Sequence, residues 1–263
     1  MPAAYAARMQ LAHELVGNGH HPAIVLVHGI TENRHMWHPL LHRLAEDHLV
    51  LAVDLRGHGG SDVCDPYDPI TYATDVVETA QSLGIEAPLL VGHSLGGVVV
   101  SAYAAIAPSV GVINVDQPLR LAGFQDGLRQ LQPLLEGSQE EFETAIGLMF
   151  GAMNGALPEA EVERIAALRG HPRQDVVLGT WDAVLHSSPE ELDGTVAALA
   201  GAISVPYLSL HGIDPGPDYA PWLTGLLPSA TVEVWPDLGH YPHLVEQERF
   251  LARLGEFEPQ VRG

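Results

Sequence analysis

The sequence is poor in cysteine, with Cys64 as the single thiol among 263 residues. One cysteine cannot form a disulfide within the chain, which excludes a disulfide-stapled fold and favours a reducing compartment. Long apolar runs are also missing, because no stretch approaches the roughly 18 consecutive apolar residues of a membrane-spanning helix. The stretch Met1–Gln10 lacks the basic and then apolar pattern of a secretory signal. We therefore expect a cytoplasmic protein without a membrane partner.

Positive charge is scarce as well, since 12 Lys and Arg stand against 33 Asp and Glu, a formal net charge of −21. A field of that sign repels phosphate backbones and anionic lipids, so we expect no nucleic-acid partner. The acids are spread over stretches such as 136–143 and 159–163, a pattern typical of solvated helix faces. With 46% hydrophobic residues and no internal repeat, the chain can build one large core.

Short apolar runs alternate with amphipathic stretches through the first half of the chain. The runs predict strands at 22–27, 49–53, 88–91 and 110–115, and the stretches between them predict helices at 36–45, 72–83 and 98–107. A looser alternation at 9–16 leads through a hairpin-type turn, Gly17–Gly19, into the first run. Strand alternating with helix is typical of an α/β fold with a mostly parallel sheet covered on both faces.

The strand signal disappears between 118 and 202, where apolar residues recur at helical spacing. We interpret 118–202 as an inserted helical cap, and 1–117 with 203–263 as the core. Strands resume at 205–210 and 231–235, and a last helix is expected at 242–257. A cap in this place would cover the carboxyl ends of the strands, where open α/β sheets bind ligands.

The segment Gly92–Gly96 has the pattern G-x-S-x-G and lies between a predicted strand and a predicted helix. A serine on such a strand-to-helix turn is typical of a nucleophile elbow. The turn is so tight that the positions two before and two after the serine must lack a side chain, and glycine meets that need. We therefore expect Ser94 to be a nucleophile.

Several motifs in this order resemble the α/β-hydrolase superfamily from about Met9 to Phe257. They are His28–Ile30 after a strand, the turn-rich loop Asp54–Asp62, the serine elbow, an acid after a late strand, and Gly239-His240 near the end. The resemblance implies an α/β-hydrolase fold and a serine, acid, histidine order along the chain. It does not define the substrate, because the fold hosts esterases, lactonases, thioesterases, carbon–carbon bond hydrolases, perhydrolases and receptors.

The family roles make Ser94 the nucleophile and His240 its general base, with His243 as the alternative base. A serine hydroxyl is a poor nucleophile near neutral pH until a neutral imidazole accepts its proton. The resemblance also assigns the oxyanion donors to the backbone N–H groups of Leu95 and Ile30.

The acid has two candidates. Asp214 follows the late strand, two residues after Gly212, where the family commonly has a spacing of three. Asp116 ends the strand after the elbow helix, the position from which haloalkane dehalogenases and zearalenone-type lactonases draw their acid. We favour Asp214, with Asp116 as the alternative and Asp237 as a remote third.

Most of the 15 histidines must have roles outside catalysis. We interpret His58 and His211 as loop-packing residues and His93 as structural. The i, i+3, i+7 spacing of His35, His38 and His42 favours an exposed helix face over a metal site, because no cysteine or carboxylate cluster accompanies them in the sequence. No metal and no cofactor are expected.

We predict a serine hydrolase that cleaves a carboxylic ester or lactone through an acyl-enzyme. The alternatives are a carbon–carbon bond hydrolase or a cofactor-free perhydrolase with the same residues, and a small-molecule receptor that turns over slowly or not at all. The charge of the chain favours a small, neutral, apolar substrate. The candidates for an apolar acyl or alcohol pocket, with core packing as the alternative role of each, are Trp37, Met149, Phe150, Met153 and Trp181.

Overall fold

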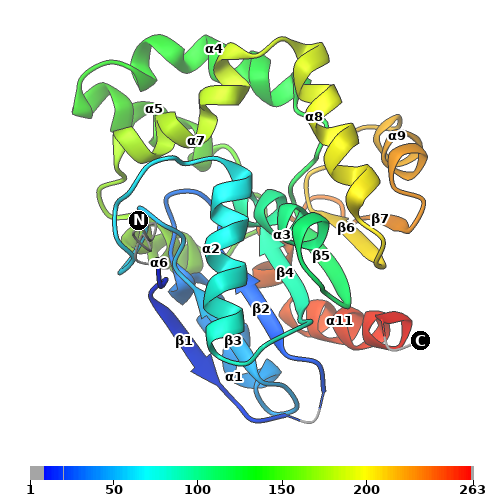
Figure 1. Cartoon of the computed structure of the whole chain (residues 1–263). Coiled ribbons are helices and arrows are strands. Elements are labelled where there is room, and N and C mark those ends of the chain that lie inside the picture. The colour runs from blue at the N-terminus through cyan, green and yellow to red at the C-terminus, as the bar shows by residue number, and fades with distance from the viewer. Residues whose placement is uncertain (1–8, 20, 262–263) are drawn as a thin grey trace, which may run out of the picture.

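The computed structural model describes residues 9–19 and 21–261, so most of the stretch Met1–Gln10 lies outside the described residues. Its strands form one seven-stranded sheet in the order β1-β3-β2-β4-β5-β6-β7 (Figure 1). All neighbouring pairs are parallel except β1 with β3, so the sheet is mostly parallel as predicted. The strands are β1 (His13–Val16), β2 (Ile24–Val27), β3 (Val50–Val53), β4 (Leu89–His93), β5 (Gly111–Val115), β6 (Tyr207–His211) and β7 (Ala230–Val234).

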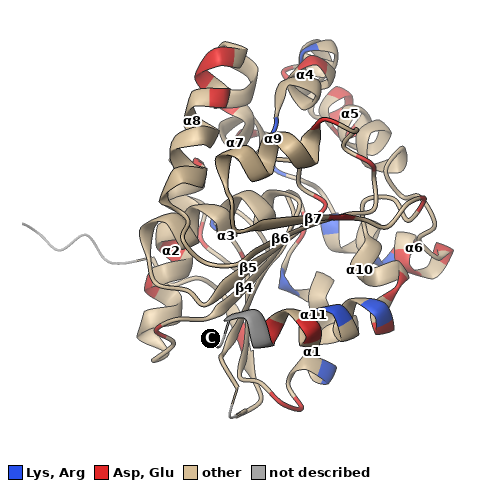
Figure 2. Ribbon diagram, turned by 90° about the vertical axis from the view of Figure 1, so that its right-hand side faces the viewer, with Lys and Arg blue, Asp and Glu red and all other residues tan. Residues whose placement is uncertain are grey.

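Helices cover both faces of this sheet. Helices α2 and α3 lie on one face, and α1 and α11 lie on the other (Figures 1 and 2). Figure 2 also shows acidic residues spread over several of the helices. No helix within 9–19 and 21–261 combines the length and the apolar character needed to cross a membrane. The helices outside the stretch between β5 and β6 are η1 (Arg34–Trp37), α1 (His38–Leu44), α2 (Pro69–Ser82), α3 (Leu95–Ile106), α9 (Tyr219–Leu226), α10 (Pro242–Val245) and α11 (Gln247–Val261).

The central strands are buried because each of their side chains meets one of the two helix layers. Every residue of β2 and β3 is buried. Side chains point alternately to opposite faces of a strand. Val25 and Val27 therefore pack in the core with α2 and α3, whereas Ile24 and Leu26 pack in the core with α1 and α11. This two-sided burial explains why the strands read as uninterrupted apolar runs.

The first strand departs from the expected hairpin. The strand β1 pairs antiparallel with β3, not with β2. The glycine turn lies against the backbone between α1 and β3, where a Cβ on Gly17 would come within 2.1 Å of the His48 oxygen and a Cβ on Gly19 within 1.9 Å of the Asp47 oxygen. Packed there, the turn carries the chain past β3 into the middle of the sheet, and β1 stays at the edge.

Local capping chemistry shifts two helix boundaries from their expected places. The helix expected at 72–83 begins at Pro69, because the Asp68 carboxylate accepts hydrogen bonds from the N–H groups of Ile70 and Thr71. The last helix is divided into α10 and α11 at Glu246, whose φ of −115° and ψ of 59° are not helical.

The stretch between β5 and β6 contains helices and no strand, all of it within the described residues. Four of its helices, α4, α5, α7 and α8, lie above the sheet in Figure 1. We call residues 118–202 the helical segment. Its helices are α4 (Ala122–Leu135), α5 (Gln139–Gly151), α6 (Glu159–Arg169), α7 (Gln174–His186) and α8 (Pro189–Ala202).

Candidate active site

Ser94 occupies the turn between β4 and α3. Its φ of 52° and ψ of −123° place it in a region that L-residues rarely adopt. A hydrogen bond from its N–H to the Val115 oxygen, 3.0 Å long, holds this conformation. A Cβ on Gly92 would lie 2.1 Å from the Gly96 oxygen, and one on Gly96 would lie 2.2 Å from the Val27 oxygen. The turn therefore accepts only glycine at both positions.

His240 lies at the same end of the sheet and is paired with Asp116. Its Nδ1 donates a hydrogen bond of 2.6 Å to Oδ2 of Asp116. The second carboxylate oxygen accepts hydrogen bonds from the N–H groups of Gly212, at 2.7 Å, and Ile213, at 3.0 Å. Burial alone would raise the pKa of Asp116, but the His240 contact and the N–H donor of Ile213 outweigh it and lower this pKa. The carboxylate therefore stays ionised beside the imidazole.

The expectation that Asp214 is the carboxylate partner of His240 is wrong. Asp214 is exposed, and its side chain accepts a hydrogen bond of 2.8 Å from the N–H of Gly216. The alternative, Asp116, follows β5 directly and has a φ of 52°. The backbone after β6 turns the N–H groups of Gly212 and Ile213 toward Asp116, whereas the side chains of Ile213 and Asp214 are exposed. The third candidate, Asp237, is also exposed.

The backbone of His240 is held on both sides. Its N–H donates to the Met153 oxygen at 2.8 Å, and its oxygen accepts from Nε2 of His93 at 2.8 Å. Burial lowers the pKa of His240, and its hydrogen bond to Asp116 offsets only part of this effect. His240 therefore favours the neutral form that can accept a proton.

The alternative base, His243, is directed elsewhere. It is fully buried, its ring centre lies 5.0 Å from that of Trp37, and its Nε2 lies 3.4 Å from Sδ of Met36. His58 and His211 lie in loop and strand packing, where their ring nitrogens meet the Arg56 oxygen and the Ser209 hydroxyl respectively.

A buried acid that the sequence did not single out supports the loop after β2. Glu32 accepts a hydrogen bond of 3.2 Å from the N–H of Gly29 and one of 2.7 Å from the Tyr241 hydroxyl. Arg169 of α6 donates to the same hydroxyl and lies 3.6 Å from the Glu32 carboxylate. Nδ1 of His93 faces the other carboxylate oxygen at 3.5 Å. Glu32 thus connects the loop after β2 with His93 and Tyr241, which both adjoin His240.

This network keeps Glu32 ionised. Burial alone would raise the pKa of the Glu32 carboxyl, but the contacts with His93, Arg169 and Tyr241 outweigh it and hold this pKa well below its usual range. Nothing local in the sequence marks these residues, because Tyr241 lies 209 positions beyond Glu32 along the chain.

A cavity of about 620 Å³ lies between the elbow and the helical segment. Ser94, Asp116 and His240 line it, together with Ile30 and Leu95. Four of the five predicted pocket residues also line it, namely Met149, Phe150, Met153 and Trp181.

Trp37 does not line the cavity, so the expectation that it belongs to the pocket is wrong. It is fully buried in the core beneath the other face of the sheet, against His243. Trp37 lies in η1, and its position on that helical turn directs its side chain inward.

The sequence matches the alpha/beta hydrolase family over residues 24–254, most of its length. The chain therefore belongs to the alpha/beta hydrolase family, which confirms the fold class expected from the motifs.

Three comparisons illustrate the range of similarity. An uncharacterized protein of Mycobacterium tuberculosis is 39% identical over 100 residues, which are 38% of this chain and 29% of that protein's length. The pimeloyl-(acyl-carrier protein) methyl ester esterase of Vibrio atlanticus is 29% identical over 260 residues, covering 91% of this chain and 95% of that protein. The structure of a thermophilic esterase from Thermogutta terrifontis has a TM-score of 0.77 at 24% identity, covering 99% of this chain and 97% of the other. At that identity the structural likeness establishes the fold alone.

Proposed function

We propose that the protein is a serine hydrolase that cleaves neutral carboxylic esters through an acyl-enzyme on Ser94. The observation that carries this proposal is the His240–Asp116 pair, 2.6 Å apart, which shares one cavity with a serine on a strained elbow. A buried neutral imidazole held in one orientation by an ionised carboxylate is what a serine nucleophile requires.

In the first half of the reaction, Oγ of Ser94 attacks the ester carbonyl while Nε2 of His240 takes the serine proton. The imidazolium that forms is stabilised by the Asp116 carboxylate. His240 then gives its proton to the leaving alkoxide, which departs as the alcohol and leaves an acyl group on Ser94. In the second half, water loses a proton to His240 and attacks the acyl carbonyl. The second tetrahedral intermediate then collapses, His240 returns this proton to Oγ of Ser94, and the carboxylic acid leaves the regenerated enzyme.

The oxyanion of each tetrahedral intermediate needs backbone donors. We assign them to the N–H groups of Leu95 and Ile30. Leu95 is the first residue of α3, so its N–H has no acceptor within the helix. Ile30 follows Gly29, where a Cβ would lie only 3.2 Å from Cβ of Ser94, so this loop runs directly beside the nucleophile. The hydrogen bond from Gly29 to Glu32 fixes the loop in that place.

We infer a substrate with an apolar acyl group. The helical segment acts as the cap in this proposal, and the residues it contributes to the cavity are mainly apolar, Phe124, Met149, Phe150, Met153, Trp181 and Val184 among them. A cavity of about 620 Å³ suits a small molecule. The name of the Vibrio relative specifies a methyl ester, which favours a small alcohol leaving group.

The test combines covalent labelling with turnover. A fluorophosphonate probe should label the wild type at one serine and fail to label Ser94→Ala. Hydrolysis of p-nitrophenyl esters should lose about 10⁴- to 10⁶-fold in kcat in Ser94→Ala while the circular dichroism spectrum is unchanged. Unchanged turnover in this variant would contradict the proposal. Labelling without steady-state hydrolysis of esters or lactones would indicate a receptor instead.

A further inference from the structure

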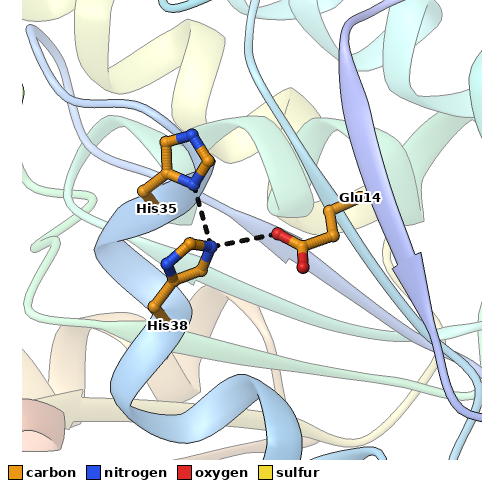
Figure 3. Close-up of side chains that lie close together, drawn as sticks. All are labelled: Glu14, His35 and His38. Atoms are coloured by element: carbon orange, nitrogen blue, oxygen red, sulfur yellow. Dashed lines mark hydrogen bonds and ion pairs between the residues drawn. The ribbon is translucent and has the colours of Figure 1, made fainter.

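Two of the three histidines expected on an exposed helix face form a cluster with a carboxylate from a distant strand (Figure 3). Nδ1 of His35 lies 2.8 Å from Nε2 of His38, and this Nε2 lies 3.0 Å from Oε2 of Glu14. Glu14 belongs to β1, His35 to η1 and His38 begins α1. His42, one turn further along α1, is exposed. The sequence near these histidines holds no carboxylate cluster, but the fold brings one carboxylate to them from β1.

The protons available to this group cannot satisfy all of its contacts. If Nε2 of His38 carries the proton, one N–H faces two acceptors, the Glu14 carboxylate and the lone pair of His35. If His35 Nδ1 carries it instead and donates to His38, the Glu14 carboxylate faces a lone pair at 3.0 Å. A cation placed between the three atoms accepts a lone pair from each of them at once.

We propose that Glu14, His35 and His38 bind a divalent transition-metal ion of the zinc type. Two imidazole nitrogens and one carboxylate oxygen are a donor set that Zn²⁺ accepts, and the three atoms lie within 4.8 Å of one another. Zinc bound at about 2.0–2.2 Å to tetrahedral ligands separates them by about 3.3 Å. The two short contacts therefore open by a few tenths of an ångström, and the longer one closes.

The surroundings permit that adjustment. The side chains of His38 and Glu14 are 46% and 32% exposed, so both retain room to move, and water can reach a fourth coordination position. The neighbouring cation, Arg34, does not oppose a metal, because its guanidinium is paired with the buried Asp54 carboxylate. The three ligand residues belong to helices and a strand, so their backbones are already fixed near the positions that metal binding requires.

A metal at this site would connect the edge strand β1 to η1. The helix η1 follows the loop that carries Gly29 and Ile30, so the ion would fasten the outer strand to the segment next to the candidate active site. A ligand that binds the folded chain and not the unfolded one stabilises the fold. The expected consequence is a zinc-dependent rise in melting temperature, separate from the hydrolysis of esters.

The test titrates ZnCl₂ into the metal-free wild type by calorimetry and repeats it with His35→Gln, His38→Gln and Glu14→Gln. His42→Gln is the matched control, since it removes an exposed histidine from the same helix. A second group of three, His21, His48 and Glu258, has its donor atoms similarly close, so His48→Gln is the second control. Removing a ligand should weaken the site by at least about tenfold, while both controls keep it.

Thermal unfolding supplies the independent readout. At a Zn²⁺ concentration about 100 times Kd, the wild type and His42→Gln should gain roughly 5–10 °C, and His38→Gln should not. Zinc bound equally well by the wild type and by all three ligand variants would overturn the proposal. Loss of the calorimetric signal in His48→Gln, with the ligand variants unaffected, would move the site to the other group and overturn it as well.

Discussion

Two neighbouring strands, β5 and β6, end at the same edge of the sheet, and each is followed by an aspartate. Asp116 comes directly after β5 and is 3% exposed, with three hydrogen bonds on its carboxylate. Asp214 comes three residues after β6, is exposed, and accepts a hydrogen bond from Gly216 within its own loop. An aspartate is thus a buried partner of histidine at the end of β5, whereas an aspartate after β6 only stabilises its own turn.

The difference lies in the backbone around each carboxylate rather than in the residue type. The N–H groups of Gly212 and Ile213, at the end of β6, are directed at the acid of β5. The loop that carries Asp214 therefore serves Asp116 as a source of hydrogen-bond donors. Two strand ends cooperate to hold one ionised carboxylate next to His240.

Among the variants that test the comparison of the two strand ends, the largest expected effect comes from Asp116→Asn. The amide keeps the volume but cannot stabilise an imidazolium, so kcat for ester hydrolysis should fall by about 10²- to 10⁴-fold. Steady-state kinetics measure the loss, and circular dichroism checks the fold. A loss of less than threefold in a folded variant would contradict the assignment of the acid to β5.

A smaller loss is expected from Glu32→Gln, which acts through the loop after β2. The uncharged amide weakens the contacts with Gly29, His93 and Arg169, so the N–H of Ile30 would be held less firmly in its proposed role as an oxyanion donor. We expect kcat to fall by roughly tenfold with little change in KM, because the contact matters most in the transition state. Tyr241→Phe removes one hydrogen bond to Glu32 and should produce a smaller change in the same direction. An effect on KM alone would indicate a role in substrate binding instead.

The pH dependence of ester hydrolysis also distinguishes the two aspartates, because only replacement of Asp116 should shift the midpoint of the pH profile. In the proposed reaction His240 must be neutral to accept the serine proton, and burial lowers its pKa from the ordinary value of 6.5. Activity should therefore rise with pH through a midpoint below 6.5. The hydrogen bond to Asp116 raises this pKa, so the residual activity of Asp116→Asn should have its midpoint at lower pH still. A wild-type midpoint well above 6.5 would contradict the assignment of His240 as a buried, neutral base.

The smallest effect is expected from Asp214→Asn, the matched variant at the neighbouring strand. Its carboxylate contacts Gly216 and is open to solvent, so kcat should change by no more than about twofold and the pH midpoint should stay in place. A loss of kcat comparable to that of Asp116→Asn would instead support Asp214, after β6, as the carboxylate that assists His240.

Features with a local cause were predictable from the sequence. The runs at 22–27 and 49–53 contain β2 and β3, because strands covered on both faces must be apolar throughout. The spacing of Gly92 and Gly96 follows from the close backbone contacts of the turn itself. In such cases the residues that determine the structure are neighbours in the chain.

Features that depend on distant contacts were not predictable in this way. The choice between Asp116 and Asp214 depends on where the N–H groups of another loop point. Trp37 was expected in the pocket, because the apolar character of a side chain does not show whether it faces the substrate cavity or the core on the other face of the sheet. Glu14 meets His38 across a fold in which β1 pairs with β3 instead of forming the expected hairpin with β2.

The hydrogen bond from the His240 N–H to the Met153 oxygen limits how a substrate can enter the cavity. Next to it, Gly155 packs so closely on Gly239 that a Cβ on Gly239 would lie 2.6 Å from Cα of Gly155. If the helical segment moved away from the core at Met153 and Gly155, it would pull His240 away from Ser94. A substrate could therefore not enter past these residues while His240 takes the serine proton. The residues that α4 and α7 contribute to the cavity are not those that hold the His240 backbone, so movement of these two helices would leave the base in place.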